Sequence, residues 1–228
     1  MIGILGGMGT QAGLDFCTKL AKLYRGKIDQ KYPLFVLYNK SDVPGRPENI
    51  KKYNKVLKSL IQGCDFLKKS KCKFIVIPCN TAHYWYDDLQ KKIKIPIISM
   101  PKEVYLHTKK ICKFKSKIGI LATDGTLKTG VYNKFFNKNY NLISPSKSLQ
   151  NKNVNKSIKY VKMGKIKEAE KIIRPAVNYL VKKKCGWTPF NNYKVKGFPA
   201  ATIVNGSIVM ENGKIISNQV GEPLDFKL

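Results

Sequence analysis

The stretch FIVIPCNTAHY, residues 74–84, joins a predicted strand to a predicted helix through a short polar turn. Its first four residues are β-branched or aromatic, which favours a buried strand. The strand pattern stops at Pro78, because proline cannot donate to a strand ladder. Cys79, Asn80 and Thr81 follow at once. The sequence therefore predicts a thiol and two polar side chains at the tip of a buried strand.

Outward from this stretch, apolar runs alternate with helical patterns as far as residue 183. The expected strands are residues 2–5, 34–38, 74–78, 95–99 and 118–122. The expected helices lie near residues 11–26, 48–70, 82–93, 101–113, 127–137, 155–163 and 165–183. The stretch 138–156, rich in Asn, Ser and Lys, predicts a long loop. This alternation predicts an α/β fold with parallel sheets and helices on both faces.

Two segments, IGILGGMGT (2–10) and IGILATDGT (118–126), have the same pattern of a short strand and a small-residue turn. They predict two pseudo-symmetric lobes, residues 1–100 and an incomplete second lobe over residues 101–184. Ligands of parallel sheets bind beyond the carboxyl ends of the strands. The turns GGMGT, PCNT and ATDGT all lie at such ends, so we expect the site there.

The chain changes character after Lys184. Residues 1–184 have a net charge of +28, and residues 185–228 have a net charge of +1. Within the second segment, short β-type runs surround two Asn-Gly pairs over residues 201–217, and Asn-Gly between apolar runs is a strong hairpin signal. We therefore expect a β-meander tail, unlike the α/β pattern before it.

The formal net charge of +29 is typical of proteins that bind nucleic acids or membrane surfaces. Nearly all of it comes from scattered lysines, without an aromatic–basic stripe or a reader motif, so compositional bias is the favoured explanation. We expect no specific nucleic-acid partner and no membrane partner. No apolar run is long enough to span a bilayer, and the first residues lack the pattern of a signal peptide. The expected location is cytoplasmic.

The six cysteines show neither CxxC pairs nor zinc-ligand spacing, so we expect free thiols and no metal site. Cys79 differs from an inert buried cysteine in its place before a predicted helix, whose dipole stabilises a thiolate. With an ordinary pKa of about 8.5, such a thiol can serve as a base. His83 is either its proton partner or a partly exposed helix residue. Arg46, in the loop SDVPGRPEN, is either a bidentate carboxylate clamp or a solvated loop arginine.

Taken together, five segments resemble the aspartate/glutamate racemase family over about residues 1–180. They are IGILGGMGT (2–10), GRPENI (45–50), IPCNTAHY (77–84), IPIISM (95–100) and IGILATDGT (118–126). One departure is Thr10, where the family usually has proline. The resemblance implies two facing α/β lobes, an amino-acid substrate between them, no pyridoxal phosphate or other cofactor, and a homodimer.

The resemblance also implies a mechanism with two cysteines, one on each face of the substrate's α-carbon. Cys79 matches one of them. The residues that would bind the substrate are Met8, Arg46, Asn80, Thr81, Thr123, Thr126 and Lys162, with Arg46 on the side-chain carboxylate. The family's second cysteine lies in a GCTE-type turn after a buried strand, and this chain has no GCTE. Cys185 is the candidate, although it follows LVKKK and precedes GWTPF.

The segment 185–226 resembles the C-terminal end of a dihydroorotase. That family's metal ligands belong to a barrel absent here, so we do not expect dihydroorotase activity. Our hypothesis is an aspartate or glutamate racemase body that is impaired by loss of the second cysteine motif. Two alternatives are a one-cysteine enzyme, such as a decarboxylase or isomerase, and a catalytically inactive anion-binding remnant.

Overall fold

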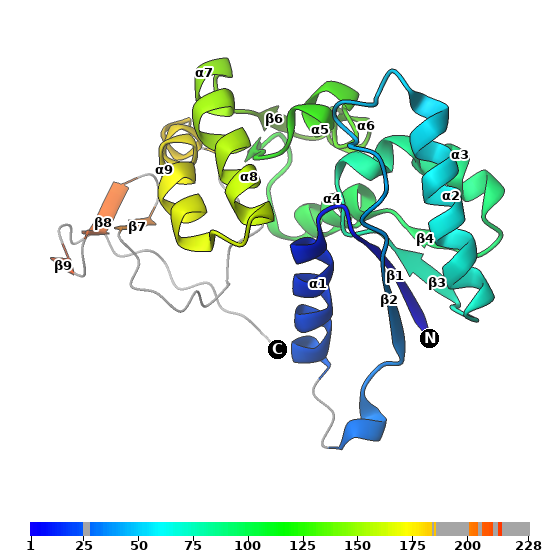
Figure 1. Cartoon of the computed structure of the whole chain (residues 1–228). Helices are drawn as coiled ribbons and strands as arrows, with labels where there is room; N and C mark the ends of the chain where they lie inside the picture. Colours follow the sequence, from blue (N-terminus) through cyan, green and yellow to red (C-terminus); the bar gives the residue numbers. More distant parts are fainter. Residues whose placement is uncertain (25–27, 184, 186–200, 205–206, 212–213, 216–228) are drawn as a thin grey trace.

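The computed structural model describes residues 1–24, 28–183, 185, 201–204, 207–211 and 214–215 (Figure 1). Its larger sheet has four parallel strands in the order β2-β1-β3-β4. They are β1 (Ile2–Gly6), β2 (Phe35–Asn39), β3 (Phe74–Val76) and β4 (Ile97–Ile98). Because all four are parallel, their carboxyl ends meet at one edge of the sheet.

Helices cover both faces of this sheet. They are α1 (Thr10–Leu23), α2 (Tyr53–Lys69) and α3 (Tyr86–Lys92), with 3₁₀ turns η1 (Asp29–Lys31) and η2 (Thr81–Trp85). Leu5 contacts Gly63 of α2, whereas Gly6 lies against Gly13 of α1. Successive strand residues point to opposite faces, so α1 and α2 lie on opposite sides, as Figure 1 shows. The core between sheet and helices is apolar and includes Trp85, which is fully buried.

A second, smaller sheet has two parallel strands, β5 (Lys117–Gly119) and β6 (Asn141–Ile143). Helix α4 (Met100–Ile111) precedes this sheet in the chain. Helices α5 (Asp124–Thr129) and α6 (Asn133–Phe136) connect β5 to β6. Ile118, Phe136 and Tyr140 form its core. The predicted α/β fold class with parallel sheets is confirmed.

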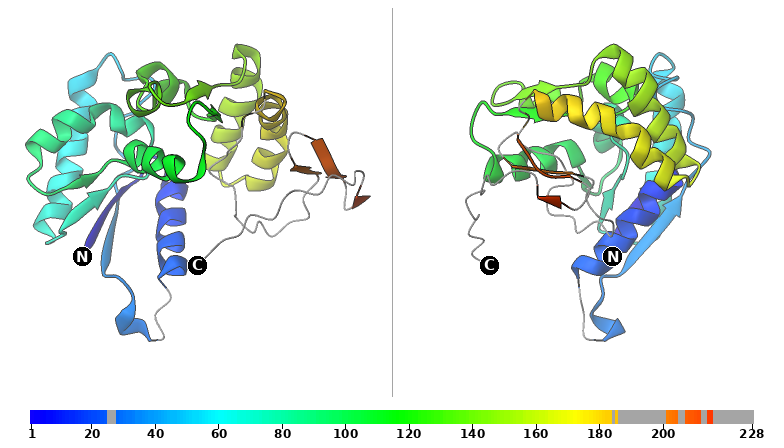
Figure 2. Two further views of the ribbon diagram at one scale, coloured as in Figure 1. Left: turned by 180° about the vertical axis from the view of Figure 1, so that it is seen from behind. Right: turned by 90° about the vertical axis from the view of Figure 1, so that its left-hand side faces the viewer.

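The prediction of a long loop over 138–156 is wrong. This stretch contains β6 and then a continuous helical run of α7 (Lys147–Leu149), a π-helical turn η3 (Gln150–Asn155) and α8 (Lys156–Lys162). These residues have low helix propensity, and hydrogen bonds stabilise the helical run instead. The Ser146 hydroxyl caps α7, and Asn153 donates to the Ile172 carbonyl at 2.8 Å. Ile172 belongs to α9 (Ile166–Lys182), which packs along α8 (Figure 2).

The tail contains a three-stranded antiparallel sheet of β7 (Ala201–Val204), β8 (Ser207–Glu211) and β9 (Lys214–Ile215). This order is the predicted β-meander. The two Asn-Gly pairs and most of the residues that resemble a dihydroorotase lie outside the described residues. Among the helices of the described residues, none combines the length and apolarity that crossing a membrane requires.

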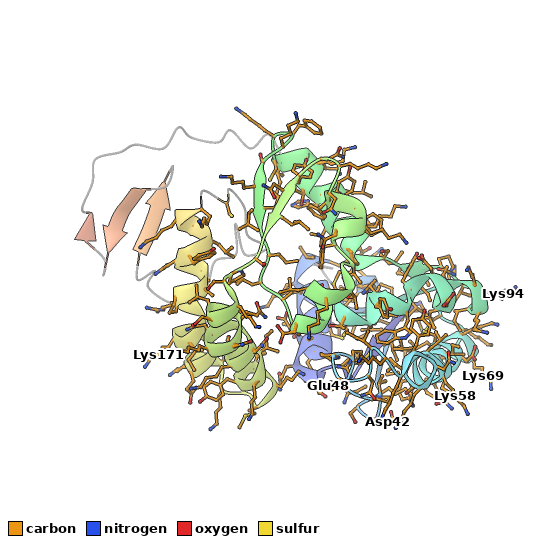
Figure 3. All side chains as sticks on the ribbon, turned by 90° about the horizontal axis from the view of Figure 1, so that it is seen from above. Asp42, Glu48, Lys58, Lys69, Lys94 and Lys171 are labelled. Carbon is orange, nitrogen blue, oxygen red and sulfur yellow. The ribbon has the colours of Figure 1, made fainter. Side chains whose placement is uncertain are left out.

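Lysines project outward from the α2 and α3 side and from α9, as Lys58, Lys69, Lys94 and Lys171 show in Figure 3. The positive charge is therefore distributed over separate helices. This arrangement agrees with scattered lysines rather than with one basic stripe.

Candidate active site at the strand tips

The first turn of the site, GGMG, packs directly on the chain that leaves β2. Gly7 has a φ of +85°, and a Cβ atom there would lie 2.2 Å from the carbonyl carbon of Lys40. Glycine is therefore required at this position by both conformation and space. The close approach fixes the turn over the edge of the sheet.

Arg46 holds the same turn from the other side. Its side chain is buried, and its Nη2 donates to the Met8 carbonyl at 2.6 Å. Its Nη1 donates to the carbonyls of Val43 and Pro44, at 3.2 and 3.3 Å. The buried Nε has no protein partner. Of the two readings of Arg46, the solvated loop arginine is wrong, because the guanidinium is enclosed by main-chain carbonyls.

The Cys79 thiol lies where β3 ends. The chain reverses tightly at Pro78, and the Cys79 amide donates to the Ile77 carbonyl at 2.7 Å. Cys79 is partly buried against the core of the larger sheet. The five-residue 3₁₀ turn η2 follows, where the sequence pattern predicts an α-helix start. A helix dipole therefore contributes less here than the sequence argument assumes.

His83 fixes the backbone of Cys79. Its Nδ1 lies 2.9 Å from the Cys79 carbonyl, and its Nε2 accepts from the Met100 amide at 3.1 Å. These two partners require the neutral tautomer with its proton on Nδ1. Burial lowers the pKa of the His83 imidazole, although hydrogen bonds to backbone carbonyls oppose the shift. His83 is buried rather than partly exposed, and its ring nitrogens are already engaged.

This lowered pKa gives a testable pH dependence. The unfolded histidine titrates near pH 6.5, whereas the folded one stays neutral to lower pH. As the pH falls below about 6.5, the unfolded state binds a proton that the folded state does not, so the free energy of unfolding should decrease. Urea unfolding at pH 7.5, 6.5 and 5.5 measures it. The decrease should be smaller in His83→Gln than in the unmodified protein; an identical decrease in both proteins contradicts the assignment.

Three threonine hydroxyls join the tips of the two sheets. The Thr81 Oγ1 atom lies 2.9 Å from the Oγ1 atoms of both Thr123 and Thr126, which are 3.0 Å from each other. Thr81 and Thr126 are buried. A Cβ on Gly125 would lie 3.0 Å from the Thr81 methyl group and from the Cα of Pro47. The turns PCNT and ATDGT therefore meet, as their placement at strand ends predicts, and the loop GRPEN lies against them.

Asn80 has a partner that the sequence analysis missed. The Tyr132 hydroxyl donates to the Asn80 Oδ1 atom. Burial raises the pKa of Tyr132 to about 12, so it remains a protonated donor at neutral pH. Tyr132 lies inside the predicted helix over residues 127–137, where nothing in the sequence distinguishes it from a core aromatic residue.

Lys162 and Cys185 lie at different places. A Cβ on Gly9 would be 3.6 Å from the Lys162 Cγ atom, so the Lys162 stem lies along the GGMG turn. Cys185 instead lies beside β5, where a Cβ on Gly119 would be 3.3 Å from its own Cβ. Burial raises the pKa of the Cys185 thiol, and nearby Lys117 partly offsets this. All six cysteines, including these two candidate bases, have free thiols.

Comparison with known proteins decides the family. The sequence profile described as Asp/Glu/Hydantoin racemase matches residues 5–187. The chain belongs to this family. The match ends close to the change in charge and pattern after residue 184, and the strands β7, β8 and β9 lie beyond its end.

Two relatives of known name are about equally similar. The broad specificity amino-acid racemase RacX of Bacillus subtilis is 31% identical over 143 residues, which cover 61% of each chain. The structure of the Picrophilus torridus aspartate racemase is 31% identical with a TM-score of 0.67, covering 78% of this chain and 74% of that one. An aspartate racemase homologue from Pyrococcus horikoshii, 21% identical with a TM-score of 0.61, shares the fold. The chain thus spans about three fifths of RacX.

Proposed function

We propose that this chain transfers a proton at the α-carbon of aspartate or glutamate, without a cofactor, and that Cys79 is the base. The observation that carries the proposal is the placement of the Cys79 thiol next to Asn80 and Thr81. Thr81 belongs to the hydroxyl cluster that joins both sheets. A carboxylate bound by these groups would bring its α-carbon toward the thiol, and the family of the chain supports the same chemistry.

The proposed substrate contacts follow from the same geometry. Asn80, Thr81, Thr123 and Thr126 offer amide and hydroxyl donors for the α-carboxylate. The Lys162 stem reaches the GGMG turn near Met8, and its ammonium group would bind the second carboxylate. Arg46 would act with it through its unpartnered Nε, while its other nitrogens hold the main chain.

The proposed chemistry begins when the Cys79 thiolate removes the α-proton and leaves a carbanion. Return of a proton from the same thiol restores the starting enantiomer. Inversion needs an acid on the opposite face. Cys185 is the candidate from sequence, but it follows helix α9 rather than a buried strand, and it lies beside Gly119 of β5. We therefore propose exchange from one face, with inversion only if another acid reaches the site.

The test is proton NMR of purified protein with L-aspartate and, separately, D-aspartate in D₂O, followed by both glutamates. Deuterium incorporation at Cα in one enantiomer, without inversion, is the expected result. Interconversion of the enantiomers would instead establish two bases. No incorporation with any of the four substrates would refute the proposed function.

A second function deserves a test because the chain lacks the GCTE-type turn that would carry a second cysteine. One-cysteine enzymes can protonate a carbanion that is formed by decarboxylation, which needs no opposing base. Substituted malonates added to the same substrate panel would reveal carbon dioxide release. Release from malonates without exchange on amino acids would favour this decarboxylase alternative.

A further inference from the structure

A polar network lies behind the ATDGT turn and involves residues that the proposed mechanism does not use. The Gln150 Nε2 atom donates to the Ala122 carbonyl at 2.8 Å and to the Asn155 Oδ1 atom at 2.9 Å. The Asn155 Nδ2 atom in turn donates to the Asp124 Oδ2 atom at 2.9 Å. Ala122 and Asp124 are the two neighbours of Thr123. The network therefore holds Thr123 from both sides.

The π-helical turn η3 makes this network possible. Gln150 and Asn155 are its first and last residues, five positions apart. In an α-helix, side chains five positions apart point in clearly different directions. The wider π turn pairs residue i with residue i+5, which brings the two amides to one side. Such single turns inside longer helices are frequent at functional sites.

The burial of Gln150 indicates a role other than stability. The side chain is 5% exposed, and its buried Oε1 atom has no partner among the described residues. A buried acceptor without a hydrogen bond destabilises a folded protein, whereas an apolar side chain of similar size would not. Unlike an apolar side chain, the glutamine holds the Ala122 carbonyl in a fixed position through its hydrogen bond.

We propose that Gln150 is a positioning residue that sets the Thr123 and Thr126 hydroxyls for binding the substrate carboxylate. The Thr123 Oγ1 atom accepts from the Thr126 amide and contacts the Thr81 hydroxyl, so a shift of the backbone at Ala122 reaches the whole cluster. The inference rests on the proposed function for its substrate. The structural part, fixation of the turn by Gln150, can be tested without any activity.

The test compares Gln150→Leu with Asn153→Leu as a matched control. Asn153 lies in the same π turn and also donates to one main-chain carbonyl at 2.8 Å, but that carbonyl belongs to Ile172 of α9. Hydrogen–deuterium exchange of the backbone, followed by mass spectrometry, should become faster over residues 119–130 in Gln150→Leu. In Asn153→Leu, this segment should exchange as in the unmodified protein.

Enzyme kinetics then test the consequence for substrate binding. The carboxylate is bound in ground state and transition state alike, so Gln150→Leu should raise the KM for α-proton exchange about tenfold with little change in kcat. Asn153→Leu should change neither constant. Gln150→Glu adds a pH signature: the protonated acid can donate to Ala122, but the carboxylate cannot. Its activity relative to the unmodified protein should rise as the pH is lowered.

The outcomes separate the two proposals. Unchanged backbone exchange over residues 119–130 in Gln150→Leu overturns the positioning role, whatever the kinetics. Faster backbone exchange with unchanged KM overturns the role in substrate binding. If the unmodified protein exchanges no substrate proton, the proposed function fails, and the role in binding a substrate carboxylate fails with it; backbone exchange then decides fixation of the turn alone.

Discussion

Cys79→Ala is expected to lower the rate of deuterium incorporation at the α-carbon of aspartate by about 10²–10⁴-fold, the usual contribution of a positioned general base. The thiol is expected to be the group that removes the proton, since it lies at the tip of β3 beside Asn80 and Thr81. Binding groups would remain, so the KM should change far less than kcat. Proton NMR in D₂O measures the rate directly.

Two other variants make this result specific. Cys79→Ser keeps the size of the side chain but replaces the thiol by a far weaker acid, so its activity should also be lost. Cys185→Ala should exchange protons at the unmodified rate, because Cys185 lies against Gly119 of β5. If Cys185→Ala is as inactive as Cys79→Ala, the two-base mechanism holds and the one-face proposal is wrong. If Cys79→Ala remains active, the base is another residue.

Local patterns predicted the parts of the fold that depend on nearby residues. The strand at Ile2–Gly6 and the thiol at the end of β3 follow from apolar runs that stop at glycine or proline. β6 was missed because its three residues, NLI, carry too short a pattern within a polar stretch. The π turn after it was missed for a related reason, since Gln150 and Asn153 are held by tertiary hydrogen bonds rather than by propensity.

In the site, too, local patterns predicted where residues lie in the chain but not their tertiary contacts. The sequence places Thr81 and Thr123 at the carboxyl ends of strands, and the structure joins them across 42 positions of the chain. The sequence could not show which way a side chain turns. Arg46 has a charge suited to a carboxylate, yet its Nη atoms bind main-chain carbonyls. Tyr132 and Gln150 act through single long-range hydrogen bonds, which leave no periodic signal.

Gly7→Ala is expected to decrease the free energy of unfolding by about 3 kcal/mol or more, combining backbone strain with loss of a buried hydrogen bond. An alanine would need the left-handed conformation at φ +85°, and its Cβ would lie 2.2 Å from the Lys40 carbonyl carbon and 2.6 Å from the Ser41 nitrogen. These are main-chain atoms, so no side-chain rotation removes the clash. The turn must move, and it carries the Met8 carbonyl away from Arg46.

Gly164→Ala is the matched control, because Gly164 has a similar φ of +74° but no heavy atom within 4 Å of the added Cβ. It should show the conformational cost alone, about 1–2 kcal/mol. Urea unfolding of both variants measures the difference, which isolates the contact between the GGMG turn and the β2 loop. Equal destabilisation by Gly7→Ala and Gly164→Ala would mean that the GGMG turn moves away from Lys40 at little cost in free energy. A clear excess for Gly7→Ala would show that the turn is rigid, as a site that aligns a carboxylate with the Cys79 thiol requires.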